Sequence, residues 1–223
     1  MPLVTGEIYH VFNRGIDKKP AFTNKREYRR AMRVIDFYRY ASLPCKLSRY
    51  LTLPDEMKTR MLNHIRKELQ TIVEIHTYCL MPNHFHFLLR QQSERGIATF
   101  ISQFQNSYTR YFNTKHEREG PLFLDQFKAV RIESDEQLLH VSRYIHLNPY
   151  TSYVISHLDD LPQYPWSSFC EYLGLQNGEE ICEKKLILSF FKSREVYKKF
   201  VFDQGDYQRE LDKIKHLLID DGK

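Results

Sequence analysis

Residues 81–89 read Met-Pro-Asn-His-Phe-His-Phe-Leu-Leu and place two histidines one residue apart in a hydrophobic run. Alternate residues of a β-strand point to the same face, so His84 and His86 would stand side by side. Two neighbouring imidazoles can bind a metal ion, although a strand can also carry two histidines for structural reasons. Pro82 and Asn83 predict a tight turn before the strand, because proline fixes φ and asparagine tolerates turn conformations.

The segments around this stretch predict two further strands. Residues 71–80 carry apolar side chains that are typical of a strand, and the short turn would join them to the His84 strand as an antiparallel hairpin. Residues 7–12 alternate and contain isoleucine, valine and aromatics, so they predict the first strand. Residues 122–132 resume an extended pattern and predict the last one.

Helical periodicity appears between these strands. Thr23 or Asn24 could cap a helix that runs through residue 40. The polar face of this helix is basic and is either a solvated surface or a contact surface for a phosphate backbone. It carries Lys25, Arg26, Arg29, Arg30, Arg33 and Arg39. Ser93 begins a second helix with an apolar stripe that includes Tyr108, Tyr111 and Phe112, which we interpret as core residues. Residues 41–70 predict a loop and a short helix from Asp55.

A capping box at residues 134–137 begins a further helix, and Pro149 should end it near Asn148. The predicted order is then strand, helix, strand, strand, helix, strand and an extra helix. This order indicates an α+β fold, the ferredoxin-like split βαβ arrangement with an antiparallel sheet. The first and third strands would be central, and the extra helix could cover the face that carries the histidine pair.

The extra helix contains Tyr144 and Asn148, which lie four residues apart and therefore share one helical face. His146 should face away from them. The histidines at positions 10, 76, 116 and 140 are interpreted as structural or exposed.

Bulk properties narrow the class of protein. No run of about 18 apolar residues is present to span a membrane, and the first residues lack the pattern of a secretory signal. We therefore expect a cytoplasmic protein without membrane contact. Four cysteines without a C-x-x-C pair favour reduced thiols. The net charge of +5 is compatible with an anionic partner but does not require one.

Six segments, in this order along the chain, resemble the single-tyrosine HUH transposases, and within them the REP-associated tyrosine transposases. They are residues 9–15, 81–86, 107–113, 120–123, 144–149 and 166–168. The resemblance implies that His84 and His86 bind a divalent metal, Mg²⁺ or Mn²⁺, and that Tyr144 is the nucleophile. Asn148 matches the third ligand, where many stand-alone insertion-sequence members carry glutamine.

The implied activity is nicking and strand transfer of single-stranded DNA through a covalent 5′-phosphotyrosine. The expected partner is single-stranded DNA with a hairpin or palindromic repeat, bound by a monomer or homodimer. Two alternatives stay open: a nucleic-acid-binding regulator without turnover, and a metal-dependent nuclease that uses water. Candidates for contact with the DNA backbone, which could equally be ordinary solvated charges, are Arg14, Arg110, Lys128 and Arg131.

The chain divides, in this interpretation, into a catalytic domain and a C-terminal extension. We predict residues 1–165 as the ferredoxin-like HUH domain and residues 166–223 as a helical extension packed on or beside it. Within the extension, residues 186–202 and 205–223 show helical spacing of apolar side chains.

Overall fold

Four strands form one antiparallel sheet in the computed structural model, which describes residues 2–175 and 180–210. In spatial order they are β2 (Val73–Met81), β3 (His84–Gln91), β1 (Ile8–Arg14) and β4 (Lys128–Arg131). Every neighbouring pair is antiparallel. The predicted ferredoxin-like α+β fold is confirmed, and the first and third strands are the central ones.

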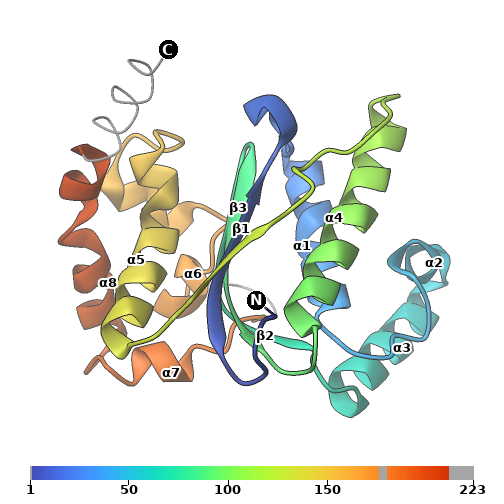
Figure 1. Cartoon of the computed structure of the whole chain (residues 1–223), viewed down its shortest axis with the longest axis horizontal. Coiled ribbons are helices and arrows are strands. Elements are labelled where there is room, and N and C mark those ends of the chain that lie inside the picture. The colour runs from blue at the N-terminus through green and yellow to red at the C-terminus, as the bar shows by residue number, and fades with distance from the viewer. Residues whose placement is uncertain (1, 176–179, 211–223) are drawn as a thin grey trace.

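One face of the sheet packs against the helices α1 (Lys25–Tyr38) and α4 (Gly96–Lys115), and two further helices, α2 (Leu47–Thr52) and α3 (Asp55–Glu68), lie beyond them (Figure 1). Strand residues Val11, Phe85 and Phe87 point into this core. Asn24 begins the first helix, because its side chain accepts hydrogen bonds from two backbone N–H groups of the first turn.

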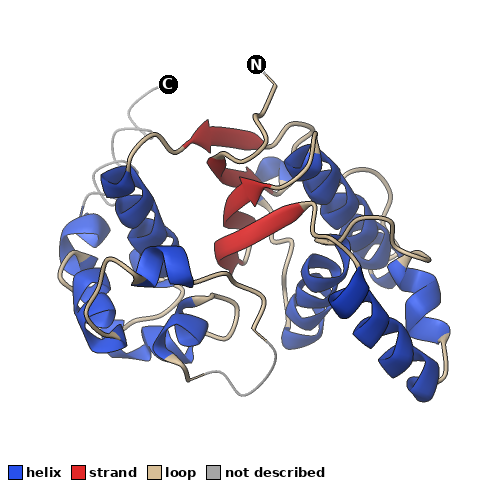
Figure 2. Ribbon diagram, turned by 90° about the horizontal axis from the view of Figure 1, so that it is seen from below, coloured by secondary structure: helices blue, strands red, loops and turns tan. Residues whose placement is uncertain are grey.

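The other face is covered by a second group of helices, so the sheet lies between two helical layers (Figure 2). Leu88 of β3 and Ile145 of the covering helix belong to a separate hydrophobic core on this side. His84 and His86 alternate with Phe85 and Phe87, so they face this layer. Its helices are α5 (Asp135–Thr151), α6 (Phe169–Leu173), α7 (Lys185–Leu188) and α8 (Arg194–Phe202).

Two short 3₁₀ helices complete the elements, η1 (Ile16–Lys18) after β1 and η2 (Leu158–Gln163) after α5. In the described part of the chain we find no helix that is both long enough and apolar enough to cross a membrane. Cys45, Cys79, Cys170 and Cys182 are free thiols.

The outer edge of β2 is paired with the C-terminal part of the chain. The Leu80 N–H donates to the Trp166 carbonyl at 2.8 Å, and the Ser168 N–H donates to the Tyr78 carbonyl at 3.0 Å. Further along, the Glu183 N–H donates to the Ile75 carbonyl at 2.8 Å. These bonds satisfy strand groups that would otherwise form an open edge. The division between residues 165 and 166 stays a prediction.

Several element boundaries differ from those predicted. Residues 41–70 contain two helices rather than a loop and one short helix, and α3 is 14 residues long. α4 begins at Gly96 and not at Ser93, since Arg95 adopts a left-handed conformation with φ of 55°. Residues 186–202 contain the end of α7 and all of α8, two helices with a break between them. The predicted helical spacing beyond residue 210 lies outside the described residues.

Pro149 does not end the helix that carries Tyr144, and α5 continues to Thr151. The residues after the proline are buried: Tyr150 is 6% and Thr151 3% exposed. The Ser152 N–H donates to the Asn148 carbonyl at 3.0 Å, which closes the last turn. Tertiary packing of this turn outweighs the local bias against helix before proline.

Candidate metal and nucleophile site

Strand β3 and helix α5 bring together four side chains from distant parts of the sequence. The rings of His86 and Tyr144 lie 5.5 Å apart between centroids, nearly perpendicular to each other. His84 Nε2 lies 3.3 Å from Asn148 Oδ1. The strand periodicity places both histidines on one face, and the helical spacing of four places Tyr144 and Asn148 opposite them.

His84 is oriented by the residue before it. His84 Nδ1 lies 2.7 Å from Asn83 Oδ1, and Asn83 Nδ2 donates to the Lys18 carbonyl at 3.0 Å. The carbonyl fixes which end of the amide faces the ring, so His84 Nδ1–H must donate to Oδ1. In its neutral form the ring then presents the lone pair of Nε2 toward Asn148.

Asn148 faces this lone pair with an oxygen that is itself an acceptor. The residue is 2% exposed, and Oδ1 also accepts from the Ser152 hydroxyl at 3.4 Å. Its Nδ2 is buried without a hydrogen-bond partner among the described residues. Two acceptors that face each other in this partly buried site repel unless a cation lies near both, so the donor chemistry here fits a metal ion.

His86 is 6% exposed. Burial lowers its pKa well below the ordinary value of 6.5, and the neighbouring rings of His84 and His10 lower that pKa further. The ring is therefore neutral at neutral pH, as a metal-binding imidazole must be. Among residues 2–175 and 180–210 no cluster of three or more His, Cys, Asp or Glu side chains could hold a metal. The candidate set instead combines two imidazoles with an amide oxygen.

His10 is part of this site, which the sequence analysis missed by treating it as structural or exposed. His10 Nε2 lies 3.0 Å from His86 Nδ1, and the His10 ring lies 5.9 Å from that of Tyr144. Burial lowers the pKa of His10 to about 4. The alternation in residues 7–12 places His10 on the same strand face as Phe12. Which side chain of β3 lies beside His10 depends on the register of β1 against β3, which the alternation does not give.

A pocket of about 680 Å³ adjoins His84. Its lining includes the predicted DNA contacts Arg14 and Lys128, and also Lys18, which the sequence analysis did not single out. Arg131 lies toward the other end of β4 and forms an ion pair with Glu7 at 2.9 Å. The pocket therefore combines positive charge with direct access to one of the two histidines.

Comparison with known proteins connects this geometry to a family. The model of the family described as "Transposase IS200 like" matches residues 38–148, a range that contains the histidine pair, Tyr144 and Asn148. This match places the chain in the IS200-like transposase family. Among curated protein sequences, none matches it.

A solved structure is similar to that of this transposase. It is described as a REP-associated tyrosine transposase bound to a REP hairpin. The TM-score is 0.52 at 12% sequence identity, and the similarity covers 81% of this chain and 90% of the other. At this identity the likeness shows a shared fold.

A groove of about 620 Å³ on the opposite side of the transposase lies between α1 and α4. Arg110, one of the predicted DNA contacts, lines it, and Arg30 stacks over the Tyr111 ring at 5.1 Å. None of the described residues that line this groove is acidic; its cationic side chains are Arg26, Arg30, Lys46, Arg110 and Lys115. We call it the α1–α4 groove.

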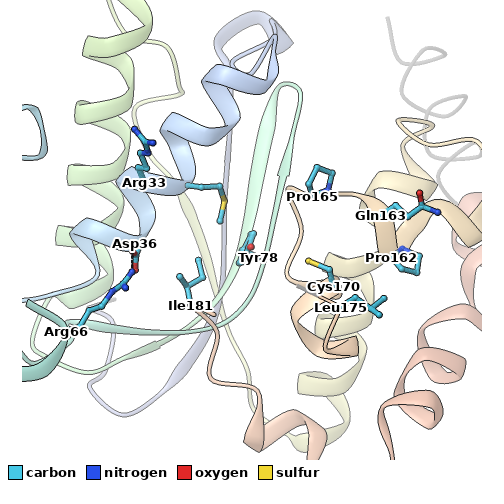
Figure 3. A pocket seen from close by; sticks show the side chains of 11 residues that line it. Arg33, Asp36, Arg66, Tyr78, Pro162, Gln163, Pro165, Cys170, Leu175 and Ile181 are labelled. Carbon is cyan, nitrogen blue, oxygen red and sulfur yellow. Dashed lines mark hydrogen bonds and ion pairs between the residues drawn. The ribbon is translucent and has the colours of Figure 1, made fainter. Parts of the chain in front are cut away.

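A third cavity, of about 530 Å³, lies beyond the β2 edge (Figure 3). Arg33, Asp36 and Arg66 line one side of it, and Arg66 is neutralised by Asp36 at 2.9 Å. Its lining includes neither histidine of the pair nor Tyr144, so it is separate from the candidate site.

His146 faces away from the candidate site, as predicted. It is fully buried between the Ser168 hydroxyl and the Tyr197 hydroxyl, each 2.8 Å from a ring nitrogen. Burial lowers its pKa to about 3, so the ring is neutral. Through these bonds α5 is tied to the start of α6 and to α8.

Proposed function

We propose that this transposase nicks and rejoins single-stranded DNA through a covalent bond to Tyr144, with a divalent metal held by His84, His86 and Asn148. The observation that carries the proposal is the pair of facing acceptors, His84 Nε2 and Asn148 Oδ1, in the same site as the Tyr144 ring. Two imidazole nitrogens and an amide oxygen suit Mg²⁺ or Mn²⁺. When bound, such an ion would polarise the scissile phosphate and offset its developing charge.

The reaction exchanges one phosphate ester for another. The Tyr144 oxygen attacks phosphorus, the bond from phosphorus to the 3′ oxygen of the DNA breaks, and the phenol proton ends on that oxygen. The products are a 5′-phosphotyrosine and a free 3′-OH, so the number of ester bonds is unchanged. Attack by a 3′-OH on the phosphotyrosine reverses the exchange and rejoins a strand, and no external energy source is needed.

The two basic surfaces are an argument for a DNA substrate that contains both a single strand and a hairpin. Arg14, Lys18 and Lys128 in the pocket beside His84 can hold phosphates next to the scissile one. The α1–α4 groove lies on the other face of the sheet and offers a second cationic surface for the backbone of a hairpin or palindromic repeat. We propose single-stranded DNA with a hairpin or palindromic repeat as the substrate and the cytoplasm as the compartment.

The test is a trapping assay with end-labelled single-stranded DNA and Mg²⁺ or Mn²⁺. Wild-type protein should give an adduct that survives denaturation, and Tyr144→Phe should give none, because the phenyl ring has no oxygen to attack. Tyr207→Phe, at a 63% exposed tyrosine, is the matched control and should give the wild-type yield.

Two results would contradict the proposal in different ways. Cleavage that persists in Tyr144→Phe but disappears in His84→Ala would indicate a metal-dependent nuclease that uses water. Salt-dependent binding without cleavage in either metal would indicate a regulator.

A further inference from the structure

His10 contacts both chemical parts of the candidate site. Its Nε2 lies 3.0 Å from His86 Nδ1, and the two rings stack with centroids 5.2 Å apart. The edge of its ring also lies against Tyr144, at 5.9 Å between centroids. The residue comes from β1, so it is positioned by a different strand from the one that carries the histidine pair.

The contact between His10 and His86 permits two arrangements of one proton. A neutral imidazole has one N–H and one lone pair, so one ring must donate and the other accept. If His10 donates, the proton of His86 lies on Nε2, and His86 cannot bind a metal through that nitrogen. If His86 donates through Nδ1–H, its Nε2 carries the lone pair that a metal ligand requires.

His84 shows the same requirement met by a different side chain. Its Nδ1–H donates to Asn83 Oδ1 at 2.7 Å, which leaves Nε2 directed toward Asn148. Metal-binding histidines generally donate their second ring N–H to an acceptor that fixes the tautomer and the ring orientation. For His86 the partner at this ring nitrogen is His10, where a carbonyl or carboxylate is more usual.

We propose that His10 is a positioning residue, whose Nε2 accepts the Nδ1–H of His86 and so presents His86 Nε2 for metal binding. This inference rests on the proposed function. His10 is then held as its Nδ1–H tautomer and does not touch the metal or the DNA in this role. The ring of His10 also packs against both His86 and Tyr144, at 5.2 and 5.9 Å between centroids, while those two rings contact each other directly at 5.5 Å.

The experiment compares metal affinity and tautomer in the full chain. Mn²⁺ binding is titrated by electron paramagnetic resonance, and nitrogen NMR of isotope-labelled histidine reports which ring nitrogen of His86 carries the proton without metal. His10→Phe keeps a ring for packing but removes the acceptor. His10→Gln offers an amide oxygen in its place, and His140→Phe removes an exposed imidazole elsewhere as the matched control.

In the wild type we expect the His86 proton on Nδ1. His10→Phe should weaken Mn²⁺ binding by roughly tenfold to a hundredfold, the usual effect of losing such a partner. His10→Gln should recover part of the loss, and His140→Phe should bind as the wild type does.

A wild-type proton on His86 Nε2 would overturn the inference, as would unchanged Mn²⁺ affinity in a folded His10→Phe. The tautomer is read in the wild type, so it decides the inference even if the variant does not fold. Absence of Mn²⁺ binding by the wild type would contradict the proposed metal site instead, which keeps the two failures distinguishable.

Discussion

At the residue scale, Asn83 orients His84, which we propose as a metal ligand. Its amide bridges the Lys18 carbonyl and His84 Nδ1, at 3.0 and 2.7 Å. The turn before β3 is therefore connected to the loop after β1, and both enclose the pocket beside His84. The same asparagine that suits the turn also selects the nitrogen that His84 presents.

We predict that Asn83→Ala weakens Mn²⁺ binding by about tenfold, because His84 loses the acceptor that fixes its tautomer and ring orientation. Calorimetric titration with Mn²⁺ measures the effect. Asn63→Ala, on the exposed side of α3, is the matched control and should not change the affinity. Equal affinities for the two variants would show that the Asn83 contact does not orient the ligand.

At the scale of elements, α5 determines where Tyr144 and Asn148 lie relative to β3. Its N-terminus is held by Ser134, whose hydroxyl accepts from the Gln137 N–H at 3.2 Å. Gln137 Oε1 accepts from the Glu133 N–H at 2.8 Å. The first bond of the predicted capping box is therefore present. In the second bond, Gln137 accepts from the backbone N–H of Glu133 instead of that of the cap residue Ser134. The other end of the helix is secured by burial.

Ser134→Ala should lower the free energy of unfolding by about 1 kcal/mol, since a backbone N–H of the first turn loses its partner. Chemical denaturation checks the value, with Ser102→Ala on the exposed face of α4 as control. The cleavage rate per folded molecule should stay at the wild-type level, because Tyr144 and Asn148, to which we assign the chemistry, lie two or more turns further along α5. If Ser134→Ala kept the wild-type free energy of unfolding but cleaved DNA more slowly, the cap would act on the site and not on stability, which would contradict this prediction.

At the scale of the whole molecule, a buried carboxylate joins the two long helices behind the sheet. Glu27 of α1 accepts from Lys115 at 2.6 Å and pairs with His116 at 2.7 Å, both at the end of α4. Burial by itself would raise the pKa of Glu27, but the hydrogen bonds from Lys115, Thr23 and His116 outweigh burial and lower the pKa to about 2. The ionised form is therefore the one that stabilises the fold.

This lowered pKa predicts how stability depends on pH. The unfolded chain takes up a proton on Glu27 near the ordinary value of 4.5, well before the folded protein does. The stabilisation is therefore complete above that pH and is lost as pH falls from 4.5 toward 2. Denaturation curves recorded across this pH range should show that the free energy of unfolding changes less with pH in Glu27→Gln than in the wild type. Glu119→Gln, at an exposed carboxylate, should retain the full change.

Local patterns were sufficient for the order of the four strands and of the helices α1, α4 and α5, and for which of His84, His86, Tyr144 and Asn148 share a face. The period-2 alternation in residues 84–89 determines that His84 and His86 share a face, and the spacing of four determines the same for Tyr144 and Asn148. Both relations depend only on residues that are close in sequence. For the same reason the cap at Asn24 and the burial of Tyr108 and Phe112 could be predicted.

The sequence by itself therefore determined the strand order of the sheet, the helix that could cover its histidine face, and which side chains of that helix and strand could meet. Only the tertiary structure decided that His10 lies against His86, that α5 continues through Pro149, and that residues 166–168 close the β2 edge. The physical reason is that these contacts depend on strand register and on packing between distant segments. No local periodicity encodes the register of β1 against β3, and that register is what gives His86 a partner for its second nitrogen.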